Sequence, residues 1–207
     1  MRLATVERSV RVAGGVGFGL AIATILRGIR RSSRHRVGRE AGQIPDILHK
    51  RGFYLPASIV GFGAMTALWR PLPLKLPQAA GTACTFAGAA MYFAGLGLFY
   101  WGRRTMGEMY DVSSALGARL YADHRLVTHG PFRYVRHPLY VAGTLAEVGA
   151  LLMYRTWASL LVVANAISLA KRARLEEEAL AAEFGAEYVA YKERTPGWFP
   201  RLRSTVA

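Results

Sequence analysis

The residues best suited to chemistry lie within residues 129–140, which hold two histidines, two arginines, two tyrosines and two prolines. Pro131 and Pro138 each interrupt a helix and favour extended backbone in the preceding residue. The polar side chains between them are therefore held on a short, stiff path that can present hydrogen-bond donors and aromatic faces to a small anionic or heteroaromatic ligand. The alternative is a cationic anchor on lipid phosphates. We favour a ligand site, because an anchor does not need glycine, prolines and histidines at fixed offsets.

A second candidate region follows residue 170, where the apolar pattern changes to that of an amphipathic helix. Its apolar and aromatic stripe, at helical spacing, comprises Leu180, Phe184, Tyr188 and Tyr191. Arg172 and Glu176 are four residues apart and meet on one face of such a helix. A solvated ion pair is the alternative interpretation. Arg172 lies where the preceding apolar segment ends, however, which places the pair at the edge of a bilayer.

Apolar segments surround both regions and predict a membrane protein. Hydrophobic residues make up 52% of the 207-residue chain and concentrate in segments 12–26, 52–69, 76–101, 139–153 and 156–170. A spanning helix needs about 20 apolar residues. We predict an all-α membrane protein with about five transmembrane helices, or four if the short first segment does not span, and a C-terminal cytoplasmic amphipathic helix. Only residues 154–155 separate the last two segments, which predicts a tight helical hairpin. The organisation expected is an N-terminal region, 1–101, and a catalytic region, 102–207.

The net charge of +14 is unevenly distributed along the chain. Lysine and arginine concentrate in alternate loops, and the positive-inside rule places residues 27–51, 102–137 and the C-terminus in the cytoplasm. No nucleic-acid motif or interleaved aromatic platform accompanies the charge, so we expect no nucleic-acid partner. The single cysteine, Cys84, excludes an internal disulfide. No His-Glu-x-x-His pair occurs, so we expect no metal site.

Small and acidic residues inside the apolar segments predict packing and possible function. Gly15 and Gly19 are spaced for close helix packing. A seven-residue repeat of glycines predicts a groove that another helix fills in preference to a substrate tail: Gly81, Gly88, Gly95 and Gly102. Glu147 lies midway through an apolar segment, where acids are costly. A substrate cavity and a hydrated interface are equally weighted explanations for it.

The two chemical regions together resemble the isoprenylcysteine carboxyl methyltransferase and phospholipid methyltransferase superfamily. Residues 126–140 are similar to its run of Gly-Pro-aromatic-Arg-Tyr leading to Arg-His-Pro-x-Tyr. The C-terminal helix is similar through Arg172, Glu176, Glu177 and Leu180, followed by Phe184, Gly185, Tyr188 and Tyr191. The resemblance covers residues 124–201, whereas the first hundred residues are similar only in being apolar helices.

This resemblance implies an integral membrane methyltransferase that uses S-adenosylmethionine without a soluble nucleotide-binding domain. It implies a cofactor pocket formed by Val127, His129, Gly130, Tyr134, His137, Tyr140 and Glu177. It places Arg172 and Glu176 at the point of methyl transfer, facing a lipophilic acceptor that enters from the bilayer. O-methylation of a carboxylate of the isoprenylcysteine type is favoured, and N-methylation of a phospholipid amine is the alternative. An NADPH-dependent membrane reductase and a non-catalytic membrane scaffold remain as readings of another class. The acceptor and the oligomeric state are not indicated.

Overall fold

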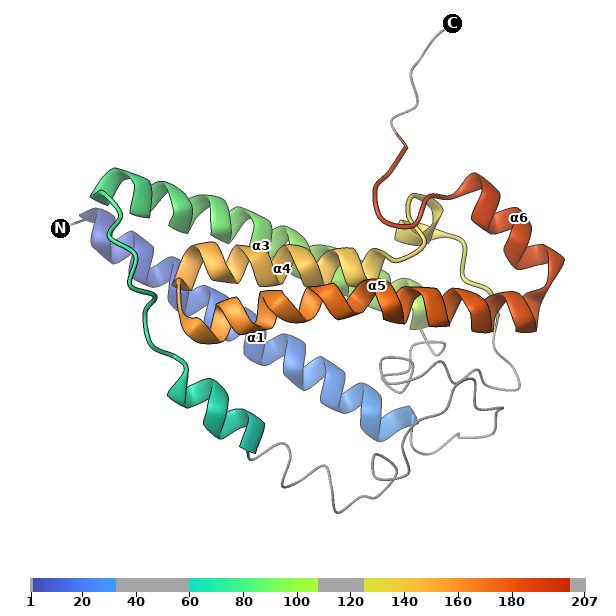
Figure 1. The fold of residues 1–207 in the computed structure, drawn as a ribbon, viewed down its shortest axis with the longest axis horizontal. Helices are drawn as coiled ribbons and strands as arrows, with labels where there is room; N and C mark the ends of the chain where they lie inside the picture. Colours follow the sequence, from blue (N-terminus) through green and yellow to red (C-terminus); the bar gives the residue numbers. More distant parts are fainter. Residues whose placement is uncertain (1, 33–59, 108–124, 202–207) are drawn as a thin grey trace, which may run out of the picture.

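The computed structural model describes residues 2–32, 60–107 and 125–201, and these are helical apart from short connections. Four long helices run side by side along the molecule, two short ones lie at one end, and residues 60–67 form a further helical stretch before α3 (Figure 1). The long helices are α1 (Arg2–Ser32), α3 (Gln78–Met106), α4 (Pro138–Tyr154) and α5 (Trp157–Phe184), and the short ones are η4 (Gly130–Arg133) and α6 (Ala186–Arg194). The predicted all-α class is therefore confirmed for the described residues.

The apolar segments of the sequence coincide with these helices, but one alone is both long and apolar enough to cross a bilayer among the residues described. That helix is α3, whereas α4 is apolar but only 17 residues long. Segment 12–26 lies inside α1. Of segment 52–69, residues 60–67 are helical, and residues 52–59 lie outside the described ranges. The number of spans stays a prediction.

Helices α3 and α4 pack backbone against backbone, because glycine removes the side chains that would hold them apart. A Cβ on Gly88 would lie 2.6 Å from the carbonyl oxygen of Gly149, and one on Gly95 would lie 2.7 Å from that of Ala142. A Cβ on Gly102 would meet the Leu139 side chain at 2.8 Å. The predicted groove is thus filled by a neighbouring helix.

The first glycine of the repeat behaves differently from the other three. A Cβ on Gly81 would meet nothing within 4 Å, so this glycine lies beyond the α3–α4 contact. The seven-residue spacing extends one repeat further than the packing that it predicts.

The packing of α1 uses different glycines from those predicted. No atom of the described residues lies within 4 Å of a Cβ at Gly15 or Gly19, so within these ranges the prediction was wrong. Gly14 makes the close contact instead, because a Cβ there would lie 2.6 Å from both the Met153 side chain and the Tyr154 hydroxyl. The hydroxyl of Tyr92 also donates to the Gly14 carbonyl at 3.0 Å. The spacing of two glycines indicated a close approach, but the rotation of α1 about its axis decides which glycine makes it.

The predicted hairpin between α4 and α5 is confirmed. Helix α4 ends at Tyr154, Arg155 takes a left-handed conformation with φ of 52°, and Thr156 begins the next helix. Thr156 and Ser159 form a reciprocal capping box, in which each side chain bonds the backbone N–H of the other. These bonds satisfy donors that the first turn of a helix leaves free.

Helix α5 continues past the predicted end of its apolar segment. It runs unbroken from Trp157 to Phe184, and the polar region that begins after residue 170 belongs to the same helix. Gly185, with φ of 50°, then turns the chain into α6. Because α5 is continuous, its polar part reaches the end of the bundle where α3 finishes and α4 begins (Figure 1), and Glu176 lies there, 3.9 Å from His137.

Candidate active site

The motif block of residues 129–138 folds as the two prolines require. Pro131 occupies the first turn of η4 and Pro138 begins α4, positions where a missing backbone N–H costs nothing. Gly130 has φ of 59°, and a Cβ there would lie 2.5 Å from the Thr105 hydroxyl. Glycine is therefore needed both for the backbone conformation and for the close approach to α3.

The two chemical regions meet at the carboxylate of Glu177 on α5. Its Oε1 lies 2.9 Å from Nε2 of His137 and accepts bonds from Arg136, at 3.0 Å from Nε and 2.7 Å from Nη2. Its Oε2 lies 2.8 Å from Nζ of Lys192 on α6. The predicted proximity of His137 and Glu177, forty residues apart in the chain, is confirmed.

Charge pairing determines the ionisation of Glu177. Burial raises the pKa of this carboxyl, whose side chain is 14% exposed. Hydrogen bonds from Lys192, His137 and Arg136 outweigh that effect and lower the pKa to about 2. Glu177 is therefore an anion at any physiological pH. Its contacts form a clasp, the name used below, that joins the motif block and α6 to α5.

The segment after α6, residues 195–198, returns to the motif block and is named the C-terminal cap here. The backbone N–H groups of Arg136 and His137 donate to the carbonyls of Pro196 and Gly197, at 2.8 and 3.1 Å. The Arg136 guanidinium also bonds the Thr195 carbonyl. These contacts hold the cap against the start of α4.

Three aromatic rings, one of them from the cap itself, lie together at the start of α4. The ring of His137 stacks on that of Tyr140 with centroids 5.5 Å apart. The Trp198 ring lies 5.5 Å from the first and 6.1 Å from the second. A cation or a flat heteroaromatic group is well matched to such a cluster of ring faces.

Glu176, beside the clasp, has a different environment from Glu177. Its Oε2 is 3.9 Å from Nδ1 of His137, and the Tyr140 hydroxyl hydrogen bonds to it. Burial raises the pKa of Glu176, and the attraction of His137 and the bond from Tyr140 oppose the rise without cancelling it. Arg172, one turn earlier on α5, is close enough to Tyr140 to act on its hydroxyl electrostatically. A carboxyl that holds its proton more tightly than usual is suited to proton transfer.

A small cavity of about 50 Å³ lies between the motif block, α5 and α6. It is lined by Met106, Leu126, Val127, Phe132, Arg136, His137, Glu176, Leu180, Tyr188 and Tyr191. The Tyr188 side chain is 1% exposed, and its hydroxyl has no hydrogen-bond partner in the described part of the chain. Burial raises the pKa of this phenol, so it remains a neutral donor. An unpaired buried donor at a cavity wall marks a place for a ligand acceptor.

Tyr191 provides a contrast on the same helix. Its hydroxyl donates to the Phe132 carbonyl at 2.7 Å, and burial, the largest cause, raises its pKa to about 12. This tyrosine joins α6 to the motif block, whereas the hydroxyl of Tyr188 has no such partner among the described residues.

The structure brings together most, but not all, of the residues predicted for the site. Val127, His137 and Glu176 line the cavity. Tyr140, Arg172 and Glu177 adjoin it through the contacts described above. His129, Gly130 and Tyr134 do not line it.

Each of these three residues has its own surroundings. His129 and Tyr134 are exposed, and the Tyr134 ring lies against Trp101 and the Arg133 guanidinium. Gly130 packs on Thr105. Their predicted contact with cofactor remains untested by this geometry.

Sequence reasoning did not assign roles to three residues that the site uses. Arg136 belongs to the quoted motif, and its place next to His137 before a proline was the available signal. Tyr188 was noted only as part of an apolar stripe, although it is the member with an unpaired hydroxyl. Lys192 gave no signal, because its contact with Glu177 depends on the turn at Gly185.

Glu147 lies seven residues after Tyr140, two turns deeper along the same face of α4. Its Oε2 is buried without a hydrogen-bond partner among the described residues. A Cβ at Gly143, between the two, would meet nothing within 4 Å. Within the same ranges, no group of three or more His, Cys, Asp or Glu side chains is arranged to hold a metal ion.

Comparison with known proteins identifies one matching family. The family described as phospholipid methyltransferase matches residues 77–187, which include α3, the motif block, α4 and α5. This span covers more than half of the chain and contains all the residues predicted for catalysis and cofactor binding.

Three curated proteins are also similar. The cobalt-zinc-cadmium resistance protein CzcN of Cupriavidus metallidurans is 38% identical over 104 residues, 45% of this chain and 48% of that protein. The nickel-cobalt-cadmium resistance protein NccN of Alcaligenes xylosoxydans xylosoxydans is 40% identical over 79 residues, 37% of each. The protein-S-isoprenylcysteine O-methyltransferase of Schizosaccharomyces pombe is 29% identical over 92 residues, 44% of this chain and 39% of that protein. The chain thus spans half or less of the length of these relatives.

Proposed function

Because the chain belongs to the phospholipid methyltransferase family, we propose that it is an integral membrane enzyme that transfers a methyl group from S-adenosylmethionine to a lipophilic acceptor. The observation that carries the proposal is the junction of the motif block with α5, where Glu176 faces a cavity beside His137 and an unpaired Tyr188 hydroxyl. Family membership alone does not name the acceptor, so the residues at this junction must support that choice.

The side chains at the junction fit the proposed cofactor in chemical type. The cluster of His137, Tyr140 and Trp198 offers ring faces to a sulfonium or an adenine. The Tyr188 hydroxyl supplies a buried donor that no protein group uses among the residues described. The cavity is smaller than the roughly 300 Å³ at the low end of ligand pockets. Binding therefore requires the C-terminal cap or α6 to move outwards.

When bound, S-adenosylmethionine supplies an electrophilic methyl group, and the acceptor lone pair forms the new bond as the sulfur–carbon bond breaks and leaves its electron pair on sulfur. The protein's main task is then to align the acceptor. Arg172 can hold an acceptor carboxylate with two parallel hydrogen bonds. A carboxylate needs no base, which is why we favour O-methylation of an isoprenylcysteine-like acid.

Glu176 decides between this acceptor and the alternative. An amine or hydroxyl acceptor has to lose a proton, and Glu176 is the carboxyl placed to take it. Because burial raises its pKa, Glu176 is a stronger base than an ordinary glutamate. N-methylation of a phospholipid amine would therefore depend on its carboxylate form.

For the membrane arrangement, we propose five spans with the site and the C-terminus on the cytoplasmic side. Helices α1 and α3 run in the same direction (Figure 1), so a chain segment must return between them, as segment 52–69 would. The ends of α1, α3 and the α4–α5 hairpin that carry few positive charges lie together at the end opposite the site, in keeping with the positive-inside rule.

Ligand binding tests the cofactor. Calorimetry on the detergent-solubilised chain with S-adenosylhomocysteine, with NADPH and with buffer alone separates the three classes of function. We expect micromolar binding of S-adenosylhomocysteine only. Binding of NADPH only would select a reductase, and binding of neither would select a scaffold.

Turnover with radiolabelled methyl donor and membrane extracts tests the site. We expect Arg172→Ala to lower methyl transfer by about 100-fold or more, since a misplaced acceptor loses the benefit of alignment. Glu176→Gln should leave transfer to a carboxylate nearly intact and abolish transfer to an amine. Arg174→Ala and Glu178→Gln, exposed on the same helix, are the matched controls. Full activity of both site variants with cofactor bound would refute the assignment.

The names of two bacterial relatives suggest a second candidate role, in which methylation contributes to tolerance of divalent metals. Growth of cells carrying the wild type or Arg172→Ala in cobalt, zinc or cadmium tests it. Equal growth of the two strains would separate metal tolerance from the proposed transfer.

A further inference from the structure

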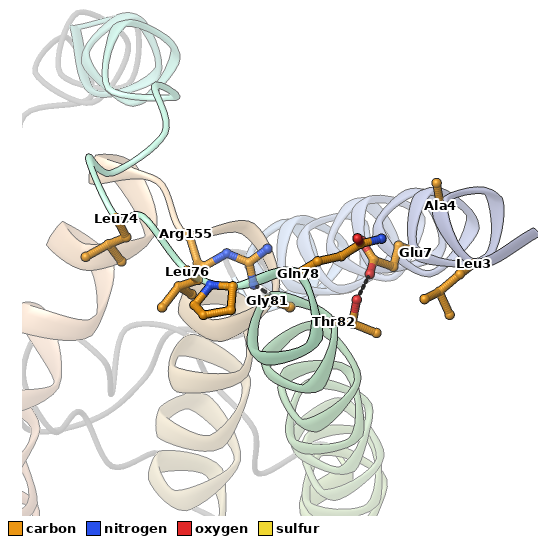
Figure 2. Close-up of a pocket in the computed structure, with 10 residues that line it drawn as sticks. Leu3, Ala4, Glu7, Leu74, Leu76, Gln78, Gly81, Thr82 and Arg155 are labelled. Atoms are coloured by element: carbon orange, nitrogen blue, oxygen red, sulfur yellow. Dashed lines mark hydrogen bonds between the residues drawn. The ribbon is translucent and has the colours of Figure 1, made fainter. Parts of the chain in front are cut away.

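A second cavity, of about 280 Å³, lies at the end of the bundle opposite the candidate site. Figure 2 shows it between the start of α1, the segment before α3, the first turns of α3 and Arg155. We name it the distal pocket. Helix α4, 17 residues long, separates it from His137 by about 25 Å. The distal pocket therefore cannot deliver an acceptor to Glu176.

The cation at this pocket is held by neutral groups. Nη1 of Arg155 donates to the carbonyl oxygens of Leu152 and Gly81, at 2.7 and 3.2 Å, and to the Thr85 hydroxyl at 3.3 Å. No carboxylate of the described residues pairs with this guanidinium. Its charge is thus fixed in place by the hairpin but not neutralised there.

The anion of the pocket lies on the facing helix. Oε1 of Glu7 accepts a bond of 2.6 Å from the Thr82 hydroxyl, and Oε2 lies 3.8 Å from Nη2 of Arg11. Figure 2 shows Gln78 between Glu7 and Arg155. Opposite charges therefore line one cavity without contacting each other.

Apolar side chains also line the pocket. Leucine side chains at positions 3, 74 and 76 line it and are exposed. The first backbone N–H groups of α3, from Gln78 onward, also lack partners within the helix and favour an anion. Acyl chains are the natural neighbours of such leucines at a membrane surface.

We propose that the distal pocket binds the headgroup of a zwitterionic phospholipid, with its phosphate at Arg155 and the α3 N-terminus and its ammonium at Glu7. The inference rests on the proposed membrane placement but not on methyl transfer. The lipid belongs to the leaflet opposite the candidate site and is retained as part of the folded protein.

Native mass spectrometry of the full chain in detergent tests the proposal with phosphatidylethanolamine, phosphatidylglycerol and diacylglycerol in competition. We expect retention in that order, with diacylglycerol not retained. Gly81→Leu places a side chain in the cavity at a position where a Cβ meets nothing within 4 Å. It should reduce retained phosphatidylethanolamine by about tenfold, the loss expected when one charge-assisted contact is removed.

The matched control is Gly97→Leu, the same change on the same helix at another glycine with open space around it. It should retain lipid as the wild type does. Glu7→Gln, which keeps the cavity volume, should abolish the preference for phosphatidylethanolamine over phosphatidylglycerol even if Gly81→Leu folds poorly. Equal retention by both leucine variants, or an unchanged preference in Glu7→Gln, would overturn the proposal.

Two further measurements identify the source and separate the proposals. Water-soluble phosphoethanolamine should not displace the lipid at equal concentration, and displacement would overturn the assignment to a lipid. S-adenosylhomocysteine binding should be unchanged in all three variants. If the wild type does not bind S-adenosylhomocysteine, the proposed methyl transfer is rejected, whereas the proposed lipid site is unaffected.

Discussion

At the scale of single residues, Glu177 joins Arg136, His137 and Lys192, which come from two regions of the chain. Because its folded-state pKa of about 2 lies below the ordinary 4.5, its ionised form stabilises the fold above pH 4.5. That contribution is lost as the pH falls from 4.5 through 2. Removing the anion leaves Arg136 and His137 largely buried without their partner.

We therefore predict that Glu177→Gln lowers the free energy of unfolding at neutral pH by about 3–5 kcal/mol, the range for breaking a buried ion pair by removing one partner. Thermal melting in detergent measures it. The difference from wild type should shrink as the pH falls from 4.5 towards 2. Glu178→Gln, exposed on the next position, should melt as the wild type does. A difference that stays constant with pH would contradict the role of the charge.

The two tyrosines of α6 give a second prediction at this scale. Tyr188→Phe removes a hydroxyl that has no partner among the described residues, so stability should not fall, while affinity for S-adenosylhomocysteine should drop by about tenfold, the value of one hydrogen bond. Tyr191→Phe leaves the Phe132 carbonyl unpaired and should cost about 1–3 kcal/mol of stability. Titration calorimetry and thermal melting measure the two effects. The reverse pattern would show that the Tyr188 hydroxyl has a structural role.

At the scale of elements, the contact between α3 and α4 depends on the absence of side chains. Gly88 and Gly149 face each other closely enough that each lies against the other's carbonyl oxygen, at 2.6 Å from a Cβ. Gly97, on another face of α3, has no such neighbour. The same substitution should therefore change the stability of the protein in opposite directions at the two positions.

We predict that Gly88→Ala destabilises the protein by about 1–3 kcal/mol, because the helices must separate to admit the methyl group. Gly97→Ala should instead stabilise it by roughly 0.5–1 kcal/mol, since alanine favours helix. Thermal melting of both variants in one detergent provides the comparison. Equal effects would mean that the two helices do not pack through Gly88.

At the scale of the whole molecule, the orientation in the membrane has a direct test. In a Cys84→Ala background, we predict that an impermeant maleimide added to intact cells labels Pro73→Cys and not Ala190→Cys, because the first lies at the pocket end and the second on α6. Permeabilised cells should label both. Labelling of Ala190→Cys alone in intact cells would show that the protein has the opposite orientation in the membrane.

The sequence predicted those features that local rules control. Prolines bounded the motif block, the residue pair 154–155 marked the hairpin, and glycine spacing indicated the α3–α4 seam. It misplaced the glycine contacts of α1, because helix rotation is decided by tertiary packing. It did not identify Lys192 as a partner of Glu177, since that contact depends on a turn at Gly185 whose direction no local pattern gives. Similarly, only the structure shows that Val127 lines the cavity whereas His129, two residues later, does not.

The close glycine contact between α3 and α4 also limits where a ligand could enter from the bilayer. The backbones of α3 and α4 are in contact along Gly88, Gly95 and Gly149, so a hydrocarbon chain cannot pass between these two helices. Another face of α4 differs. A Cβ at Gly143 would meet no described atom within 4 Å, and Glu147, two turns from Tyr140, has a buried carboxylate oxygen without a partner among the described residues. We therefore expect the proposed lipophilic acceptor to approach along that face of α4, past the carboxyl of Glu147.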